Sequence, residues 1–457
     1  MHQVIVQIMP PKPAHSKEVL APRSKELEFG GFFGALFVTV TVPLTMYYLA
    51  FGCSEELGCD LSLPISRPDA LWEFARTSFI ASFTDKRAWA IYYGWYVYCV
   101  IAWFVLPGKW VQGLPLRTGA TLEYKINAFS TGALALGVAV GVIVKRPDVF
   151  SILYDHWPGL LTAAFVNSLV QAFFVYAGSF TGNKLLALGG NSGNPLFDWF
   201  IGRELNPRIG KFDIKTFNEL RPGLLLWVFL DLSCACHQWK TFGEVSDSMI
   251  LVTIFHSWYV VDSLLHESTI LTQMDITTDG FGFMLSVGDL AWLPFTYSLQ
   301  ARYLAFSPVK LGWMGIVAVL AVQSVGYYIF RTSNVEKNDF RHGKNPKSTS
   351  EIPYFQDLQY MTTSTGSKLL VSGWWGRSRH PNYLGDWIMA WAWCLPCGFS
   401  TPIPYFYVVY FAVLLVHRQL RDDDACKKKY GSEYVTAKEQ VLTTSTTAGT
   451  LTYVTLT

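Results

Sequence analysis

The chain has 457 residues, of which 51% are hydrophobic and only 15% are charged. Proteins usually contain about 25% charged residues, so the composition argues against soluble domains, and a net charge of +2 is too small to indicate a nucleic-acid partner. Aromatic residues reach 16%, which is typical of a protein with two membrane interfaces.

Long apolar stretches recur along the chain, and a helix needs roughly 20 such residues to cross a bilayer. A polar N-terminal arm, residues 1–30, comes before them and lacks the apolar core of a cleavable signal. The predicted spans are residues 31–51, 88–106, 127–145, 159–180, 223–239, 248–265, 283–304, 310–331, 384–399 and 403–418. We therefore expect an all-α, polytopic membrane protein with about ten transmembrane helices.

Two internal segments are too polar or irregular to span, residues 184–222 and 332–383, and the tail from residue 435 to 457 is low in complexity. Basic residues in short loops predict the orientation of the chain. They include Lys25 in the arm and Lys109 and Lys125 after the second span, so the segment 332–383 and the end of the last span should also be cytosolic.

Cationic and aromatic side chains gather near the last three predicted spans. Lys337 and Arg341 are four residues apart and share a face if the helix continues, although a snorkelling helix end explains them equally well. Trp375, Asn382 and Tyr383 offer two ring faces and an amide, which suit a planar heterocycle; the alternative is an aromatic belt at the membrane interface.

A third polar group follows the last span and runs from His417 to Gly431, with Asp422 and three consecutive lysines. Alone it would be a solvated helix. Together the three groups supply cations for phosphates, rings for stacking and carboxylates for ribose hydroxyls, which are the partners of a nucleotide. Guanidinium and ammonium groups favour a 2′-phosphate and hence NADP over NAD.

Carboxyl groups also occur in or beside the span predicted at 283–304, and a carboxylate in lipid is expensive unless it is paired or neutral. A buried carboxyl group is held protonated and can act as a general acid. The alternative is that these groups hydrogen-bond neighbouring helices. The candidates for a proton donor and its support are Tyr297 and Asp289, with Glu267 and Asp279 behind them, and Pro294 should bend the helix between the first two.

The chain resembles the sterol reductases, the group that contains the delta-14 and delta-7 sterol reductases and the membrane domain of the lamin B receptor. The resemblance runs from about the first span to Tyr434, and its most specific pieces are residues 193–208, 271–300 and 374–386. Within the family, Asp279-Gly-Phe-Gly-Phe-Met and Gly288-Asp-Leu look like the delta-14 branch. The sterol-reductase membrane domain would then cover residues 31–434, with NADPH bound by about 332–434.

The resemblance implies NADPH reached from the cytosol, a sterol substrate of the delta-8,14 diene type, surrounding membrane lipid, and a multi-pass location in the endoplasmic reticulum. The nucleotide contacts that it implies are Lys337, Arg341, Leu370, Trp375, Asn382, Tyr383, Asp422, Cys426, Lys427, Lys428, Lys429 and Tyr430. The expected reaction is protonation of the delta-14 double bond followed by hydride transfer.

Other functions stay open at this point. A delta-7 reductase and a catalytically inactive sterol-binding homologue share the same motifs. Isoprenylcysteine carboxyl methyltransferases also carry an Arg-His-Pro-x-Tyr type of segment before an apolar helix, but they are shorter and do not need the block 271–300. A lamin or chromatin tether is disfavoured because only about 30 polar residues precede the first span.

Overall fold

The structure is a computed structural model, and it describes residues 17–61, 66–341, 357–364, 366 and 368–436. The chain divides into two compact units. The larger unit comprises residues 11–310 and 397–404, and the smaller unit comprises residues 311–396 and 405–457 together with the first ten residues. The expected tail was residues 435–457, of which residues 437–457 lie outside the described residues, as do residues 1–16 of the N-terminal arm.

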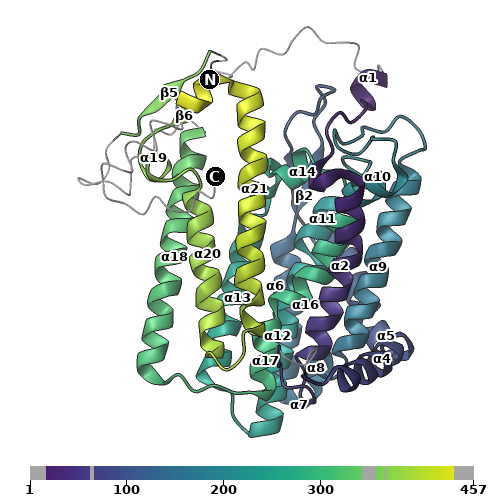
Figure 1. Cartoon of the computed structure of the whole chain (residues 1–457), viewed down its shortest axis with the longest axis vertical. Coiled ribbons are helices and arrows are strands. Elements are labelled where there is room, and N and C mark those ends of the chain that lie inside the picture. The colour runs from purple at the N-terminus through teal and green to yellow at the C-terminus, as the bar shows by residue number, and fades with distance from the viewer. Residues whose placement is uncertain (1–16, 62–65, 342–356, 365, 367, 437–457) are drawn as a thin grey trace. The chain divides into compact units, whose positions relative to one another are not determined.

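Long apolar helices dominate both units (Figure 1). Within the described residues, eight helices are long and apolar enough to cross a membrane, which confirms the polytopic, helical class. In the larger unit they are α2 (Gly31–Gly52), α5 (Lys86–Val105), α6 (Ala128–Lys145), α9 (Trp157–Gly178), α12 (Pro222–Phe242, preceded by α11, Ile214–Leu220) and α13 (Asp247–Leu265).

The span predicted at 283–304 is a broken helix, as Pro294 led us to expect. It consists of α15 (Phe283–Val287), a π-helical turn η3 (Gly288–Trp292), α16 (Leu293–Tyr297) and α17 (Leu299–Phe306). Proline has no N–H to donate and its ring crowds the preceding turn, so a regular α-helical ladder cannot continue through it. Single-turn π-helices are rare and occur often at functional sites.

Short elements fill the segments between the long helices of the larger unit. They are α1 (Lys17–Leu20), η1 (Glu28–Gly30), α4 (Pro68–Thr84), α7 (Pro147–Phe150), α8 (Ile152–Asp155), α10 (Pro195–Ile201), η2 (Glu267–Thr272) and α14 (Met274–Thr277). Two antiparallel hairpins pair β1 (Lys109–Gln112) with β2 (Glu123–Ile126) and β3 (Arg208–Ile209) with β4 (Phe212–Asp213). These strands are too short to have been predicted from alternation of apolar residues.

The segment 184–222 holds the N-terminal arm in place. The Leu186 N–H donates to the Leu20 carbonyl at 2.8 Å, and the Ser24 N–H donates to the Asn191 carbonyl at 3.1 Å. Gly202, with φ of 92°, lies so close to the Gly280 backbone that a Cβ would be 2.3 Å from its carbonyl carbon. Only glycine tolerates both this conformation and this approach.

The smaller unit is built on α18 (Gly312–Arg341), α20 (Pro381–Cys394) and α21 (Phe406–Tyr430). It also contains β5 (Tyr360–Thr362) paired antiparallel with β6 (Lys368–Leu370), and the one-turn helix α19 (Trp374–Arg377); short 3-10 turns η4 (Leu395–Cys397) and η5 (Ile403–Tyr405) border it. Helix α18 continues ten residues beyond the predicted end at 331, which places its polar end on a regular helix. Helix α20 is too short to count among the eight long helices.

Helices α18 and α20 approach each other at a pair of glycines and lie side by side in Figure 1. A Cβ on Gly385 would lie 2.5 Å from the Phe330 nitrogen and 2.7 Å from the Gly326 carbonyl oxygen. The absence of a side chain therefore lets the two backbones touch, and this contact fixes the spacing between the helices that carry the candidate site.

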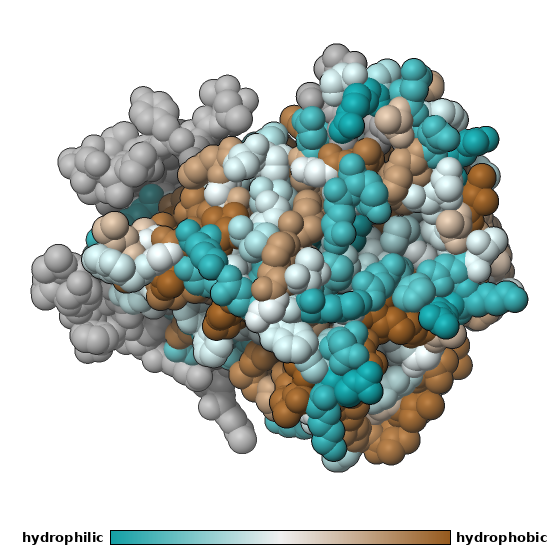
Figure 2. Space-filling model, turned by 90° about the horizontal axis from the view of Figure 1, so that it is seen from below, coloured by the Kyte–Doolittle hydropathy of each residue, from teal (hydrophilic) through white to brown (hydrophobic). Residues whose placement is uncertain are grey.

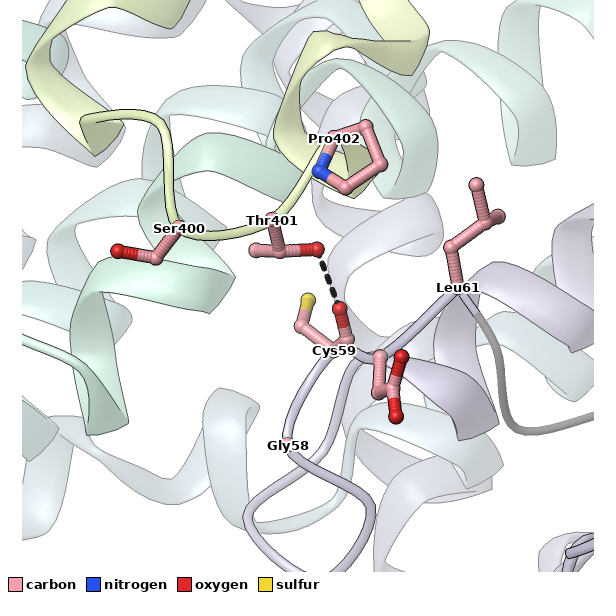
Figure 3. Close-up of a pocket in the computed structure, with 7 residues that line it drawn as sticks. Gly58, Cys59, Leu61, Ser400, Thr401 and Pro402 are labelled. Carbon is pink, nitrogen blue, oxygen red and sulfur yellow. Dashed lines mark hydrogen bonds between the residues drawn. The ribbon is translucent and has the colours of Figure 1, made fainter. Parts of the chain in front are cut away.

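Cys53 and Cys59 form a disulfide. The loop is tied to the turn 400–402, because the Thr401 hydroxyl donates to the Cys59 carbonyl (Figure 3). A pocket of about 480 Å³ opens there, lined by Gly58, Cys59, Asp60, Leu61, Ser400, Thr401 and Pro402. The buried Arg302 stabilises the loop, because its guanidinium Nε donates to the Cys53 carbonyl at 2.8 Å.

Figure 2 views the molecule from below, the end at which Figure 1 labels α4, α7 and α8. In the coloured part of Figure 2, hydrophilic side chains gather over this face, and hydrophobic side chains lie mainly toward the edge of the view. Such a distribution is expected where helices leave a bilayer, since their lipid-facing surfaces stay apolar while their ends meet water.

Candidate functional site

The candidate site in the smaller unit starts from the polar end of α18. The Lys337 ammonium lies 4.0 Å from the centroid of the Trp375 ring. The indole is only 8% exposed, and its Nε1–H donates to the Ser333 carbonyl at 3.0 Å. A cation over a desolvated indole face is a strong example of a cation–π contact. This contact holds Lys337 and Trp375 in place, and both residues were predicted from the sequence as nucleotide contacts.

The start of α20 supplies the amide and the phenol. Pro381 is the first residue of the helix, where its missing N–H costs nothing. The Asn382 side-chain nitrogen faces the Asn334 Oδ1 at 3.4 Å, which joins α20 to α18. The Tyr383 ring stacks on His380 with centroids 4.7 Å apart and an interplanar angle of 8°.

His380 is held in its neutral form. The pKa of this imidazole is lowered to about 4, mainly by burial; Asp422 and Asp423 oppose this shift, whereas the charges of Lys337 and Arg379 contribute to it. The neutral His380 ring can stack on Tyr383 without bringing a buried charge. This side chain therefore stays uncharged over the physiological pH range.

Helix α21 completes the group. Arg341, Asp422 and Cys426 lie close enough to the Lys337 ammonium to interact with it electrostatically, so the four side chains are neighbours. We call the following residues the rim cluster: Lys337, Arg341, Trp375, Asn382, Tyr383 and Asp422. The structure thus brings together, at one end of α18, α20 and α21, residues that are up to 85 positions apart in the sequence, 422 minus 337.

The other six predicted contacts lie outside the rim cluster, although Cys426 is a neighbour of Lys337. Leu370 is half-buried in β6, opposite Tyr360. Lys427 forms an ion pair with Asp423 at 3.3 Å, and Lys428 and Lys429 are exposed, the latter lying 5.0 Å from the Tyr430 ring. Exposed lysines beside an anion site add mainly long-range attraction.

Sequence reasoning missed a residue that shapes the turn before α20. Glu336 is only 3% exposed, and its Oε1 accepts a hydrogen bond from the Trp374 N–H at 2.9 Å. Gly373 adopts a φ of 65°, and a Cβ there would lie 2.4 Å from the same carboxyl oxygen. Nothing in the spacing of Glu336 and Trp374 indicates this contact, because they are 38 residues apart.

In the larger unit, Asp289 stands in the π-helical turn. Its Oδ2 is buried and has no hydrogen-bond partner within the part of the chain that the structure describes. Glu219, Asp275 and Lys215 are its charged neighbours. The Asp289 backbone also packs against Gly223, where a Cβ would lie 1.7 Å from the Asp289 carbonyl oxygen. An open carboxyl oxygen in a dry, locally unusual backbone is the kind of group that handles protons.

Tyr297 ends α16, eight residues after Asp289. Its ring meets the fully buried Trp227 edge-on, with centroids 5.4 Å apart. Another neighbour of the Trp227 ring is His256, with centroids 4.7 Å apart, and the His256 Nδ1 pairs with the Asp231 Oδ2 at 2.8 Å. Both members of this pair are fully buried, and no sequence pattern predicted their contact.

The two remaining candidates are engaged in the packing of the larger unit. Glu267 accepts from the buried Arg221 at 2.6 Å through Oε1 and from the Ala128 N–H at 2.8 Å through Oε2. Asp279 is 6% exposed, and its carbonyl accepts from the fully buried Lys215 Nζ at 2.8 Å. We therefore rank Glu267 behind Asp289 and Tyr297 as a proton donor, because two hydrogen bonds already engage its carboxyl oxygens, and Asp279 behind them because its backbone carbonyl is fixed in the packing of this unit.

Helices of this length and apolarity define a polytopic membrane protein, and the cations, rings and carboxyl groups at their polar ends and in their interior are candidates for function. Comparison with known sequences identifies the family. Residues 23–443 match the ergosterol biosynthesis ERG4/ERG24 family, and the chain belongs to it. The match continues past Tyr434, where the resemblance seen in the sequence ended.

Several similar proteins are sterol reductases by name. The chain is 50% identical over 415 residues to the delta(14)-sterol reductase erg24 of Schizosaccharomyces pombe, covering 90% of this chain and 94% of that protein. It is 41% identical over 429 residues to the delta(14)-sterol reductase ERG24 of Saccharomyces cerevisiae, covering 91% and 95%. It is 44% identical over 416 residues to the delta(14)-sterol reductase LBR of Gallus gallus, covering 90% of this chain and 62% of that protein.

Proposed function

We propose that the protein reduces the delta-14 double bond of a delta-8,14 sterol diene with NADPH, in the biosynthesis of ergosterol or a related sterol. The support comes from two sides. The relatives named above are called delta(14)-sterol reductases, and their matches cover 90% and 91% of this chain. The observation that carries the proposal is the rim cluster, whose cations, rings and amide suit a phosphorylated dinucleotide.

The residues present fit NADPH. The Asn382 Oδ1 is buried without a hydrogen-bond partner within the described residues, so it offers an acceptor for an amide or hydroxyl donor. Lys337 and Arg341 would hold the 2′-phosphate, and Trp375 and Tyr383 would contact the rings. Asp422 would accept from a ribose hydroxyl. Bound there, NADPH supplies the hydride.

An isolated alkene does not accept a hydride, so the protein must first protonate it. A proton added to carbon 15 of the sterol leaves a tertiary cation at carbon 14, which then takes the hydride, so that the double bond becomes a single bond with one new hydrogen at each carbon. We propose Asp289 and Tyr297 as proton donor and support. The open Asp289 Oδ2 and the aromatic surroundings of Tyr297 are the features that suit them to protonate and to stabilise a transient cation.

We place the protein in the endoplasmic reticulum membrane, with the rim cluster in the cytosol. Disulfides persist in oxidising compartments such as the lumen of this organelle. The Cys53–Cys59 loop and the turn 400–402 contact each other and would be lumenal. Since α21 leaves that turn and runs to Tyr430, its polar end would reach the opposite, cytosolic side, in agreement with the basic loops.

Purified protein incubated with NADPH and either a delta-8,14 or a delta-7 sterol tests the proposal. We expect loss of the diene absorbance and a product two mass units heavier with the first sterol only. Asp289→Asn should abolish turnover while NADPH still binds; the exposed Asp148→Asn is the matched control and should be fully active. Wild-type protein that binds NADPH but reduces the delta-7 sterol alone would contradict the assignment, and an active Asp289→Asn variant would contradict the role of Asp289.

A further inference from the structure

Three consecutive aspartates stand near the end of α21, Asp422, Asp423 and Asp424. Successive residues of an α-helix point about 100° apart, so the three carboxylates face three directions. Asp424 is exposed and Asp422 is half-buried beside Lys337 and His380, whereas Asp423 is only 6% exposed. Identical side chains therefore occupy three different environments, and the buried one is not part of the rim cluster.

Asp423 is held by three donors. The Arg379 guanidinium donates to its Oδ1, the Tyr434 hydroxyl donates to the same oxygen at 2.7 Å, and the Lys427 ammonium lies 3.3 Å from its Oδ2. Arg379 also donates to the Tyr434 hydroxyl at 3.1 Å, which closes a triangle. Burying a carboxylate is costly unless several donors satisfy it, and here they come from three segments of the chain.

Each corner of the triangle is next to a part of the proposed nucleotide site. Arg379 directly precedes His380 and lies three residues before Asn382, while Asp423 directly follows Asp422. Tyr434 lies in the short helical turn 432–436 that follows Gly431, and its pKa is raised by burial and by its hydrogen bond to Asp423, so the phenol stays a donor. The triangle thus joins the turn before α20 to the end of α21.

The same C-terminal turn is tied to the β5–β6 hairpin. The Glu433 carboxylate accepts from the Ser364 N–H at 2.8 Å and from the Ser364 hydroxyl at 2.9 Å. The turn 431–434 therefore contacts all three segments that carry predicted nucleotide contacts besides α18: the hairpin, the turn before α20 and α21.

We propose that Arg379, Asp423 and Tyr434 are positioning residues for the nucleotide: they fix Asn382 and Tyr383 relative to Asp422. This inference rests on the proposed function. None of the three needs to touch the nucleotide, but binding groups must be held to within about 0.5 Å of their productive positions. Without the triangle, the end of α21 and the turn before α20 are free to move apart, and each nucleotide must restore their geometry at a cost in affinity.

The test is a set of aspartate-to-asparagine variants, Asp422→Asn, Asp423→Asn and Asp424→Asn, with Tyr434→Phe as a milder change. Detergent-purified proteins are compared for the NADPH Kd, the sterol Kd and the thermal midpoint. We expect Asp423→Asn to weaken NADPH about tenfold or more, and Tyr434→Phe about three- to tenfold, as loss of a charged or neutral hydrogen bond implies. The sterol Kd should change less than about twofold, and Asp424→Asn should match wild type.

The alternative role is general stability of the fold. It predicts that Asp423→Asn lowers the thermal midpoint and weakens both ligands equally, and that Tyr434→Phe leaves the NADPH Kd unchanged; either result overturns the proposal. If Asp423→Asn does not fold, Tyr434→Phe decides alone. Failure of wild type to bind NADPH contradicts the proposed function itself, whereas normal NADPH binding by wild type and by both variants contradicts only the positioning role.

Discussion

The contact between Lys337 and Trp375 is open to a quantitative test. The perturbation is a double-mutant cycle made of Lys337→Met, Trp375→Leu and the double variant, with NADPH affinity as the readout. Methionine keeps most of the length of the lysine without its charge, and leucine keeps an apolar contact without the ring.

The size of the coupling follows from the geometry. The ammonium lies 4.0 Å from the ring centroid, and the indole is 8% exposed, so this contact belongs to the desolvated end of the cation–π range, about 2 kcal/mol. In addition, without the ring the Lys337 side chain is less ordered, so it is less well placed to bind a phosphate. Because the contact already exists in the ligand-free protein, this cation–π energy is the upper bound of the coupling in NADPH binding: we expect the double variant to bind NADPH more tightly than the sum of the two single losses predicts, by up to about 30-fold, since 1.4 kcal/mol is tenfold.

The assay is equilibrium binding of NADPH to protein purified in detergent, followed by fluorescence. Lys211 and Trp110 provide a matched control, because the ammonium lies 4.9 Å from the ring but both side chains are exposed. The same cycle there should leave NADPH affinity unchanged. Additive losses at Lys337 and Trp375, within about 0.5 kcal/mol, would refute the reasoning that the two side chains act as one unit.

Three further predictions concern stability. Gly385→Ala should lower the free energy of unfolding by about 1–3 kcal/mol, because the new methyl group would meet the Phe330 backbone; an unchanged thermal midpoint would contradict the close approach of α18 and α20. Cys53→Ser together with Cys59→Ser should cost about 2 kcal/mol, since the bridge closes a loop with a sequence separation of only 6; a thermal midpoint equal to that of wild type under non-reducing conditions would count against the bridge. The folded protein lowers the pKa of His380 from 6.5 to about 4, so the unfolded chain binds more protons between these values; stability should be constant above about pH 6.5 and fall toward pH 4, and His380→Gln should reduce that slope. If the free energy of unfolding depends on pH with the same slope in wild type and in His380→Gln, His380 does not cause the loss of stability toward pH 4.

Apolar length was enough to predict most of the membrane helices. The stretch at 127–145, for example, appears as α6 (Ala128–Lys145), because about 20 apolar residues have few alternatives to a membrane helix. Local chemistry also located the break at Pro294 and the shared face of Lys337 and Arg341. It could not show the π-helical turn at Gly288, which depends on how the backbone around Asp289 packs on α12.

Contacts between distant residues were beyond the sequence. Asp231 and His256 are 25 positions apart, and Arg379 and Asp423 are 44 apart, so periodicity carries no information about either pair. The candidate residues of the rim cluster were found from their side-chain chemistry, and the resemblance to a family pointed to the same residues; the structure then showed that they are neighbours. Asp423, the centre of the triangle, belongs to the run of charged residues that begins at His417. From a single sequence, such a run can only be assigned to a solvated helix surface.

The central claim is that the rim cluster binds a dinucleotide by its 2′-phosphate. The most direct measurement compares NADPH and NADH affinity for wild type and for Lys337→Ala with Arg341→Ala; the exposed pair Arg146→Ala with Lys310→Ala serves as the charge-matched control. We predict that wild type prefers NADPH, that the cluster variant loses most of this preference while its NADH and sterol affinities change little, and that the control behaves as wild type. Equal losses of NADPH, NADH and sterol affinity in the cluster variant would contradict the account.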